Sequence, residues 1–305
     1  MKLGIFYGGA QDVQGHVQGA IDAENDGFDS VWYGQIFGPD VLTVIALAGQ
    51  RTSRIQFGTS VVPTYGRHPT VMAQQALTTQ SAAGGRFSLG IGLSHAPVVE
   101  AMWGLSYDRP AVHMREYLTI VQSLIQTGRA DFEGEMFKVH ATVAVPADSK
   151  PGVLIAALAP VMLKTAGTMC DGTITWMTGP KTLESHVLPR LTKAAKEAGK
   201  GEPRVVVGLP VAVTDNAAEA RERAGRSFMV YGTLPNYQRM LQKEGATGPA
   251  DVAIVGNEAE VERQIRAVAS AGATEFAVAA FPVGDDAQAS LARTRACVKS
   301  LIGKV

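Results

Sequence analysis

Residues 51–92 of the chain read RTSRIQFGTSVVPTYGRHPTVMAQQALTTQSAAGGRFSLGIG. Two apolar segments in this stretch, residues 55–62 and 87–91, carry many β-branched and aromatic side chains and predict strands. Between them, residues 70–82 have the length and pattern of a helix. A buried strand, a helix and a second buried strand form the unit from which parallel sheets are built.

The same alternation recurs along the whole chain. Further strands are predicted at residues 2–7, 30–33, 153–157, 172–175, 204–213 and 275–280. Further helices are predicted at residues 13–25, 39–50, 112–126, 161–169, 181–198, 216–243, 258–271 and 286–302. The strands are continuous apolar runs, as expected where both faces of a sheet are covered. Eight such repeats with one crossover hand predict an α/β fold, a closed (β/α)8 TIM barrel.

The main alternative is an open, doubly wound sheet. Its first strand would normally lead into a glycine-rich phosphate loop, but Gly8-Gly9-Ala10-Gln11 lacks the GxGxxG spacing. Gly90-Ile91-Gly92 follows the fourth strand, and its third glycine is missing. The glycine pattern therefore favours the barrel.

We expect one domain over residues 1–305, because no Ser-, Gly- or Pro-rich linker divides the chain. Two segments interrupt the alternation and are expected to be insertions on the rim of the barrel. The first is near residues 128–150, with a hairpin predicted at residues 131–145, and the second, residues 225–251, is expected to be irregular. Cys170 and Cys297 have no metal-ligand spacing, so we expect buried free thiols and no metal.

Charge and hydropathy narrow the class of partner. Lysine plus arginine equals aspartate plus glutamate, 28 each, so the chain lacks the basic excess that is typical of nucleic-acid binders. No run approaches the ~20 apolar residues that a membrane span needs, and the apolar N-terminal stretch is too short for a signal peptide. We therefore expect a cytoplasmic protein with a small-molecule substrate and no membrane or nucleic-acid partner.

In a barrel, the active site lies at the carboxyl ends of the strands. The residues there are Tyr7, Gly8, Tyr33, Gly34, Gln35, Ser60, Val61, Gly92, Leu93, Ser94, His95, Ala157, Leu158, Ala159, Pro160, Trp176, Met177, Val213 and Phe281. They include no carboxylate pair for glycoside hydrolysis and no His/Asp/Glu triplet for a metal. Small, apolar and aromatic residues suit a flat ring, and the reactive chemistry would then belong to a cofactor.

The segment Ala157-Leu158-Ala159-Pro160 ends a strand and opens a helix. Proline is favoured at the first position of a helix, and the free amides there attract anions such as a cofactor phosphate. An ordinary βα turn needs the same residues. On the motif alone, that structural interpretation is favoured by roughly two to one.

Residues 51–92 resemble the signature region of the luciferase-like monooxygenase superfamily, in particular its branch of oxidoreductases that use the deazaflavin coenzyme F-420. The stretches ENDGFDSVWYG (residues 24–34) and LIAALAPVMLKTAGTMCDGTITWMTGP (residues 154–180) support this resemblance, as does GPADVAIVGNEAEV near the C-terminus. The resemblance covers nearly the whole chain. It implies a barrel, usually a homodimer, with the cofactor at the carboxyl ends of the strands.

The resemblance also implies a site. A non-prolyl cis peptide bond between Ser60 and Val61 would support the ring, residues 92–95 would edge it, and residues 157–160 would hold the phosphate-bearing tail. The implied cofactor contacts are Gly34, Ser60, Val61, Gly92, Leu93, Ser94, His95, Ala157, Leu158, Ala159, Pro160, Thr175 and Trp176. The agreement between this tail site and the turn described above reverses the preference for an ordinary turn.

Two positions depart from related sugar-phosphate and alcohol dehydrogenases, and we predict both as catalytic-site residues. Those enzymes carry an Asp-His pair where this chain has Gly34-Gln35, and glutamine is no general base at neutral pH. They also carry a glutamate where this chain has His95. An imidazole there either transfers a proton beside the hydride-transfer centre or only hydrogen-bonds the ring or a carbonyl.

These features predict an oxidoreductase that passes a hydride between coenzyme F-420 and a small organic substrate. Two alternatives stay open: a monooxygenase using reduced FMN and oxygen, and a non-catalytic flavin-binding protein. Candidate walls of the substrate space are Tyr65, Trp103, Tyr107 and Trp176. His68, before Pro69 at a helix start, is expected to have a rim or capping role. His113 is expected to belong to a packing or ion-pair network, with a role in the site as the alternative.

Overall fold

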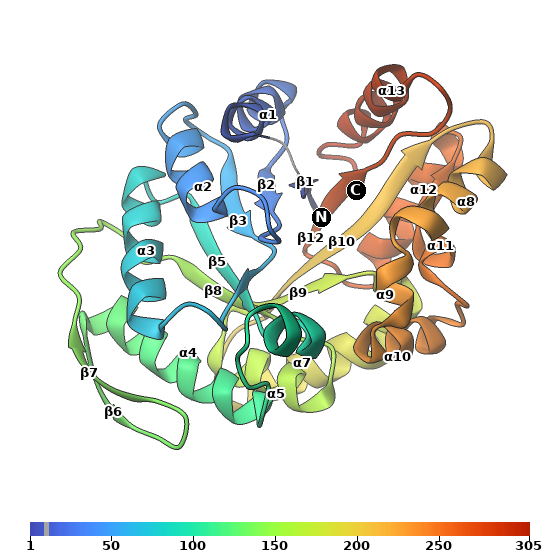
Figure 1. Ribbon diagram of the computed structural model, residues 1–305. Coiled ribbons are helices and arrows are strands. Elements are labelled where there is room, and N and C mark those ends of the chain that lie inside the picture. The colour runs from blue at the N-terminus through green and yellow to red at the C-terminus, as the bar shows by residue number, and fades with distance from the viewer. Residues whose placement is uncertain (9–11) are drawn as a thin grey trace.

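In the computed structural model, which describes residues 1–8 and 12–305, eight parallel strands close into a barrel (Figure 1). In order round the ring they are β1 (Lys2–Tyr7), β2 (Ser30–Tyr33), β3 (Gln56–Thr59), β5 (Phe87–Gly92), β8 (Gly152–Ala156), β9 (Gly172–Trp176), β10 (Arg204–Val213) and β12 (Glu275–Ala280). Parallel pairing of β12 with β1 closes the ring. The predicted TIM barrel is therefore confirmed, and the open sheet is excluded. Residues 9–11, part of the segment compared with a phosphate loop, lie outside the described residues.

Seven of the predicted strands agree with the observed ones to within one residue at each end. The exception is the strand predicted at residues 55–62, which is interrupted after β3 and resumes as β4 (Val62–Pro63). β4 pairs with the end of β5, with Val62 opposite Ile91 and Pro63 opposite Gly92. The interruption falls at Ser60 and Val61.

Helices surround the ring of strands (Figure 1). They are α1 (Val13–Asp26), α2 (Val41–Gly49), α3 (Pro69–Ala82), α4 (Pro110–Thr127), α5 (Pro160–Met169), α7 (Leu188–Glu197), α8 (Ala217–Ser227), α12 (Glu258–Ser270) and α13 (Ala287–Ser300). Side chains of Asp12, Asp40, Asn216, Asn257 and Asp286 accept backbone amides at helix starts. Such caps satisfy amides that have no partner within the helix.

The first predicted insertion is a hairpin outside the barrel, drawn at the lower left of Figure 1. Its strands are β6 (Arg129–Glu133) and β7 (Lys138–Thr142), paired antiparallel. The Glu116 carboxylate of α4, only 6% exposed, accepts the amides of Glu135, Met136 and Phe137 at 2.8–3.0 Å. These three bonds stabilise the ionised carboxylate, lower the pKa of Glu116 against the effect of burial, and fasten the hairpin to α4.

The second predicted insertion was expected to be irregular, and that expectation was wrong. Residues 225–251 are largely helical, and the segment continues into a short strand that pairs with β10. Its elements are α9 (Met229–Thr233), α10 (Pro235–Glu244), α11 (Pro249–Val252) and β11 (Ile254–Gly256). Prolines in this segment open helices at their first position, where the missing amide costs nothing, and do not break them.

Two π-helical turns were also missed. They are η1 (Pro97–Met102), which follows β5, and η2 (Leu183–Val187), which lies between α6 (Pro180–Thr182) and α7. The sequence predicted only a continuous helix at residues 181–198. Widened turns of this kind leave little trace in residue spacing.

Large rings fill the barrel interior only where the facing strand has glycine. Trp32 of β2 is 1% exposed, and a Cβ atom at Gly58 of β3 would lie 2.2 Å from its ring. Trp32 Nε1 donates to Glu275 at 2.6 Å, and Glu275 also accepts Ser30 Oγ and lies 3.2 Å from Arg204. This buried polar group closes the amino-terminal end of the barrel.

We predict that Gly58→Ala lowers the free energy of unfolding by about 1–3 kcal/mol, because the added methyl group overlaps the Trp32 ring. Denaturant unfolding followed by circular dichroism measures the change. Gly201→Ala is the matched control, since a Cβ atom there meets no atom within 4 Å. Equal stability of the two variants would contradict this packing.

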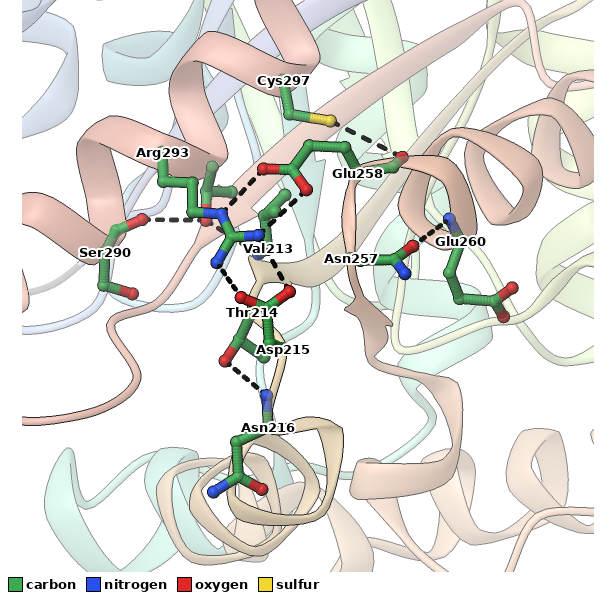
Figure 2. Close-up of polar contacts among 11 residues, drawn as sticks. Val213, Thr214, Asp215, Asn216, Asn257, Glu258, Glu260, Ser290, Arg293 and Cys297 are labelled. Carbon is green, nitrogen blue, oxygen red and sulfur yellow. Dashed lines mark hydrogen bonds and ion pairs between the residues drawn. The ribbon is translucent and has the colours of Figure 1, made fainter.

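A second group of ion pairs and hydrogen bonds holds the loop that follows β10. Figure 2 shows the Arg293 guanidinium of α13 between two carboxylates, Asp215 at 2.9 and 3.1 Å and Glu258 at 2.7 and 3.0 Å. The Val213 amide donates to Thr294 of α13 at 2.9 Å. These contacts join the carboxyl end of β10 to α12 and α13, and so position the start of α8.

The hydrogen bonds from Arg293 hold the pKa of Glu258 at about 2, below its ordinary value of 4.5. The ion pair therefore contributes fully above about pH 4.5, and its contribution is lost as pH falls through 2. Both side chains are partly exposed, so we expect Arg293→Gln to cost about 1 kcal/mol or less at pH 7.

Urea unfolding at pH 7 and near pH 2 tests this expectation, with the difference between wild type and variant shrinking at the lower pH. Arg263→Gln serves as control, because Arg263 pairs only with Glu260 in its own helix. A difference that stays constant over this pH range would contradict the assignment.

Candidate active site at the carboxyl ends of the strands

The inner layer at the carboxyl ends of the strands contains two large rings and otherwise small residues. Phe6 of β1 and Trp176 of β9 stack with their centroids 5.2 Å apart and their planes 22° apart. Neighbouring inward positions are Gly34, Ser60, Gly92, Ala156 and Gly208. Two stacked rings bordered by residues without long side chains are a suitable support for a planar ligand.

The predicted ring-contact residues come together at this layer. A Cβ atom at Gly34 would lie 3.0 Å from the Phe6 ring and 3.5 Å from the Ser60 carbonyl oxygen. A Cβ atom at Gly92 would lie 2.5 Å from Val61 and 3.4 Å from Ala156. These close approaches bring the ends of β2, β3, β5 and β8 together round the two rings.

The peptide bond between Ser60 and Val61 is cis, as the resemblance implied. On one side, the Ser60 amide donates to the Tyr33 carbonyl at 2.7 Å. On the other, Thr59 Oγ1 donates to the Gly90 carbonyl at 2.7 Å and accepts the Gly90 amide at 2.8 Å. Both neighbouring strands thus hold this segment at the floor of the site.

The loop after β5 positions Leu93, Ser94 and His95. Ser94 has a positive φ of 59°, and its carbonyl oxygen accepts Tyr107 Oη at 3.4 Å. The His95 carbonyl oxygen accepts the amides of Val98 and Val99, which starts η1. Leu93 is half-buried against the main core.

The His95 side chain is half-buried, with its ring centroid 5.8 Å from that of Tyr237 in α10. Burial lowers the pKa of His95, and no charged or hydrogen-bonding group among the described residues offsets this shift. The ring is therefore neutral at pH 7. It offers one nitrogen as donor and one as acceptor to whatever binds there.

Gln35 has a structural task. Its Oε1 accepts the Val41 amide at 3.0 Å, next to Asp40, which caps α2 by accepting the Thr43 amide. The side chain thus closes the loop between β2 and α2. A direct role of Gln35 in the reaction stays a prediction.

The turn from β8 to α5 combines free amides with unpartnered polar atoms. Ala159 precedes α5 without a side-chain cap, Pro160 takes the first helical position, and Val161 is 61% exposed. On β9, Thr175 is 1% exposed, and its hydroxyl has no partner among the described residues. Buried polar atoms normally have a partner, so the Thr175 hydroxyl fits a ligand with an acceptor group.

Several aromatic residues at the site came from elements that the sequence did not connect with it. Tyr231 of α9 and Phe228, just before α9, pack edge-on against Trp176 at 5.8 and 5.9 Å, and Tyr231 contacts Tyr237 at 5.1 Å. Figure 1 shows α9 and α10 beside β9 and β10. These residues lie where the helix predicted at residues 216–243 overlaps the segment expected to be irregular, and no local signal placed them at the site.

Among the proposed wall residues, Tyr65 and Tyr107 stack with centroids 5.4 Å apart. Tyr65 also stacks on His113 at 4.1 Å, and His113 Nε2 lies 3.1 Å from Thr64 Oγ1. Trp103 ends η1 and is half-buried. His113 is thus part of a packing network, as predicted.

Predictions were also made for one histidine, for the two cysteines and for membrane spans. His68 caps α3, with Nδ1 accepting the Thr70 amide at 3.3 Å, as expected. Cys170 and Cys297 are free and buried, also as expected. Among the described residues, no helix is long and apolar enough to cross a bilayer.

Two surface hollows lie at the other end of the barrel. One, of about 480 Å³, is lined by residues such as Lys2, Asp29 and Thr274. The other, of about 660 Å³, is lined by residues such as Gly152, Asp171 and Arg204. These residues sit at the amino ends of the strands, away from the face where barrels carry their active sites.

The family model for luciferase-like monooxygenases matches residues 1–301. The chain belongs to this family. The family match covers nearly all of the barrel, including the segments that form the floor and the β8–α5 turn.

Relatives in the luciferase-like family include a Mycobacterium tuberculosis protein named as a coenzyme F-420-dependent oxidoreductase, 40% identical over 126 residues. That match covers 41% of this chain and only 36% of the relative. An F-420-dependent glucose-6-phosphate dehydrogenase of Kineococcus radiotolerans is 29% identical over 298 residues, which are 92% of this chain and 86% of the relative.

Solved structures share the fold. A coenzyme F-420-dependent tetrahydromethanopterin reductase of Methanopyrus kandleri superimposes with a TM-score of 0.81 at 22% identity, over 100% of this chain and 98% of that one. The oxygenating constituent of a 3,6-diketocamphane monooxygenase of Pseudomonas putida, in complex with FMN, gives a TM-score of 0.77 at 18% identity, over 100% and 97%.

Histidine titration by NMR tests the electrostatics of this end of the barrel. Burial sets the pKa of His113 at about 4 and lowers that of His95, while Glu133 and Asp131 raise that of the exposed His140. We expect His140 to titrate above 6.5, His95 below it, and His113 lowest. A His95 resonance titrating above that of His140 would contradict the desolvated site.

Proposed function

We propose that this chain is a coenzyme F-420-dependent oxidoreductase that moves a hydride between the coenzyme and a small organic substrate. One observation carries the proposal: the small residues beside the Ser60–Val61 bond, in the same layer as the stacked Phe6 and Trp176 rings. Support comes from a relative aligned over 92% of the chain whose name specifies an F-420-dependent dehydrogenase.

The residues present fit such a coenzyme. Gly34, Ser60 and Val61 would support the ring, and the segment from Gly92 through Leu93 and Ser94 to His95 would edge it. The tail phosphate would bind the amides at the start of α5, within Ala157, Leu158, Ala159 and Pro160, flanked by Thr175 and Trp176. The fit of the tail phosphate rests on the Thr175 hydroxyl, which is buried, has no partner among the described residues and could donate a hydrogen bond to a phosphate oxygen.

When bound in its reduced form, the coenzyme would supply a hydride from C5 of its ring, and the chain would orient the substrate and transfer the proton. His95 is neutral at pH 7, so it can accept a proton from a substrate that is being oxidised. In the reductive direction, one ring nitrogen would take up a solvent proton while the other releases its proton to the substrate. Tyr231 packs edge-on against Trp176, and Tyr237 packs against Tyr231, so these rings would shield one side of a bound ring from water. Desolvation strengthens each polar contact made there.

Cationic side chains on the rim differ in their pairing. On the described loops, Arg67 pairs with Asp40, and Arg109 pairs with Glu135 at 2.5 Å. Lys181, in the short helix α6 that follows β9, is a further rim cation, so the rim accommodates an anionic substrate as well as an uncharged one. Exposed apolar side chains on the same rim include Phe37, Met102 and Met229, at 64–67% exposure.

The alternative function is an FMN-dependent monooxygenase fed with reduced flavin. The specific observation in its favour is the fold shared with an FMN-bound oxygenating protein. A third possibility, a flavin-binding protein without activity, is disfavoured by the neutral, unpaired His95 at the ring edge.

We also propose a homodimer through α2 and α3, whose Leu47 and Val71 are 46% and 45% exposed.

Side-by-side titration of the chain with coenzyme F-420 and with FMN tests the choice of cofactor. We expect at least a hundredfold preference for coenzyme F-420, about 2.7 kcal/mol, measured by fluorescence. Tighter binding of FMN, together with oxygen consumption in the presence of reduced FMN and substrate, would contradict the proposal and favour the monooxygenase.

His95→Ala tests the proton-transfer role. With reduced coenzyme F-420 and an activated alkene such as 2-cyclohexen-1-one, we expect turnover to fall by about 10²-fold or more. Coenzyme affinity should change by less than about threefold, which is under 0.7 kcal/mol. His140→Ala, on the exposed hairpin, is the matched control. Unchanged turnover in His95→Ala would remove this residue from the reaction.

A further inference from the structure

A buried histidine lies beneath the β8–α5 turn. His186 belongs to the π-helical turn η2, is 4% exposed, and donates from Nε2 to the Leu158 carbonyl oxygen at 2.8 Å. Arg190 Nη1 donates to the His186 backbone carbonyl at 2.9 Å, which holds the histidine from behind. The histidine and the turn are 28 residues apart in sequence, so η2 brings a specific donor to one carbonyl.

That carbonyl belongs to the segment that leads into α5. The Ala159 carbonyl is already used, because it accepts the Leu163 amide at 2.9 Å. Pro160 has no amide, so Val161 and Met162 provide the first free amides of this ten-residue helix. A carbonyl oxygen that pointed toward these amides would repel an anion bound there. The bond from His186 instead holds the Leu158 oxygen toward the histidine ring.

A second, independent observation marks the same turn as a ligand site. Thr173 of β9 donates from Oγ1 to the Ile155 carbonyl on β8 at 2.9 Å. Thr175 is two residues further on and faces the same side of β9, next to the end of β8, where Ala156 pairs with Ile174. Its buried hydroxyl has no partner among the described residues, although that of Thr173 has one.

We propose that His186 is a positioning residue for an anionic group, the phosphate of the coenzyme tail, at the start of α5. It acts through Leu158: the Nε2–H bond keeps that carbonyl away from the anion and leaves the Val161 and Met162 amides and the Thr175 hydroxyl free to bind it. This inference rests on the proposed function, because it deepens the role of the tail site.

The neutral form of the imidazole suits this role. Burial lowers the pKa of His186, and the positive charges of Arg190 and Lys243 lower it further, against the effect of the Leu158 bond. A neutral ring with its proton on Nε2 makes the observed bond and brings no charge of its own. The side chain therefore sets geometry and does not attract the anion directly.

A cycle of ligand truncation and mutation tests the proposal. The ligands are coenzyme F-420 and its deazaflavin riboside, which has the same ring but no phosphate tail; the measurement is equilibrium binding by fluorescence. In the wild type we expect the phosphate-bearing ligand to bind at least about tenfold more tightly, since bonds to charged groups contribute strongly. In His186→Leu we expect this ratio to fall about fivefold or more, with riboside affinity changed less than about twofold.

Two variants separate positioning from general packing. His186→Gln retains a side-chain donor and should keep most of the phosphate preference. Leu183→Ala, in the same π-helical turn and fully buried, should lower the melting temperature while leaving the ratio unchanged. This pair shows whether the selective loss comes from the donor or from damage to η2.

Three results would overturn the proposal. The first is an unchanged affinity ratio in His186→Leu, whether both ligands bind equally more weakly or neither does; this result would defeat only the positioning role. The second is a wild-type ratio near one. The third is a wild type that binds neither ligand, which would also defeat the proposed function.

Discussion

The inside of this barrel has a fixed and small volume, and each large ring in it must face a position without a side chain. Trp32 takes the space opposite Gly58 in the middle layer, and a Cβ atom at Gly90 would lie 2.0 Å from the Thr59 carbonyl oxygen. At the carboxyl end, the Phe6–Trp176 stack faces Gly34 and Gly208. In the middle layer, side chains fill the interior completely, so no further ring fits there. In the layer at the carboxyl end, the Phe6–Trp176 stack presents a flat surface.

That surface determines what the site can do. The described strand ends present no pair of carboxylates and no cluster of metal ligands, so their contribution is shape, backbone amides and one neutral imidazole. A reactive ring held on the Phe6–Trp176 floor would have His95 at one edge and the α5 amides at the other end. Hydride chemistry by a bound coenzyme would match this division of tasks.

The sequence predicted the barrel because its strands are buried on both faces and read as continuous apolar runs. Strands such as Arg204–Val213 were located to the residue. The cis bond at Ser60 followed from the family resemblance alone. Residue spacing did not reveal η2, which places His186 under Leu158, or the packing of Tyr231 on Trp176, because both depend on contacts between segments far apart in sequence. Gln35 was assigned near the reaction, yet its visible bond caps α2, a task that only coordinates reveal.

A crystal structure of the chain with coenzyme F-420 would show directly where the ring binds. We expect electron density for a planar ring against Ser60 and Val61, with His95 at its edge and the tail phosphate at the amides that open α5. Density for the ring in the hollows at the amino ends of the strands, or outside the barrel, would contradict this expectation.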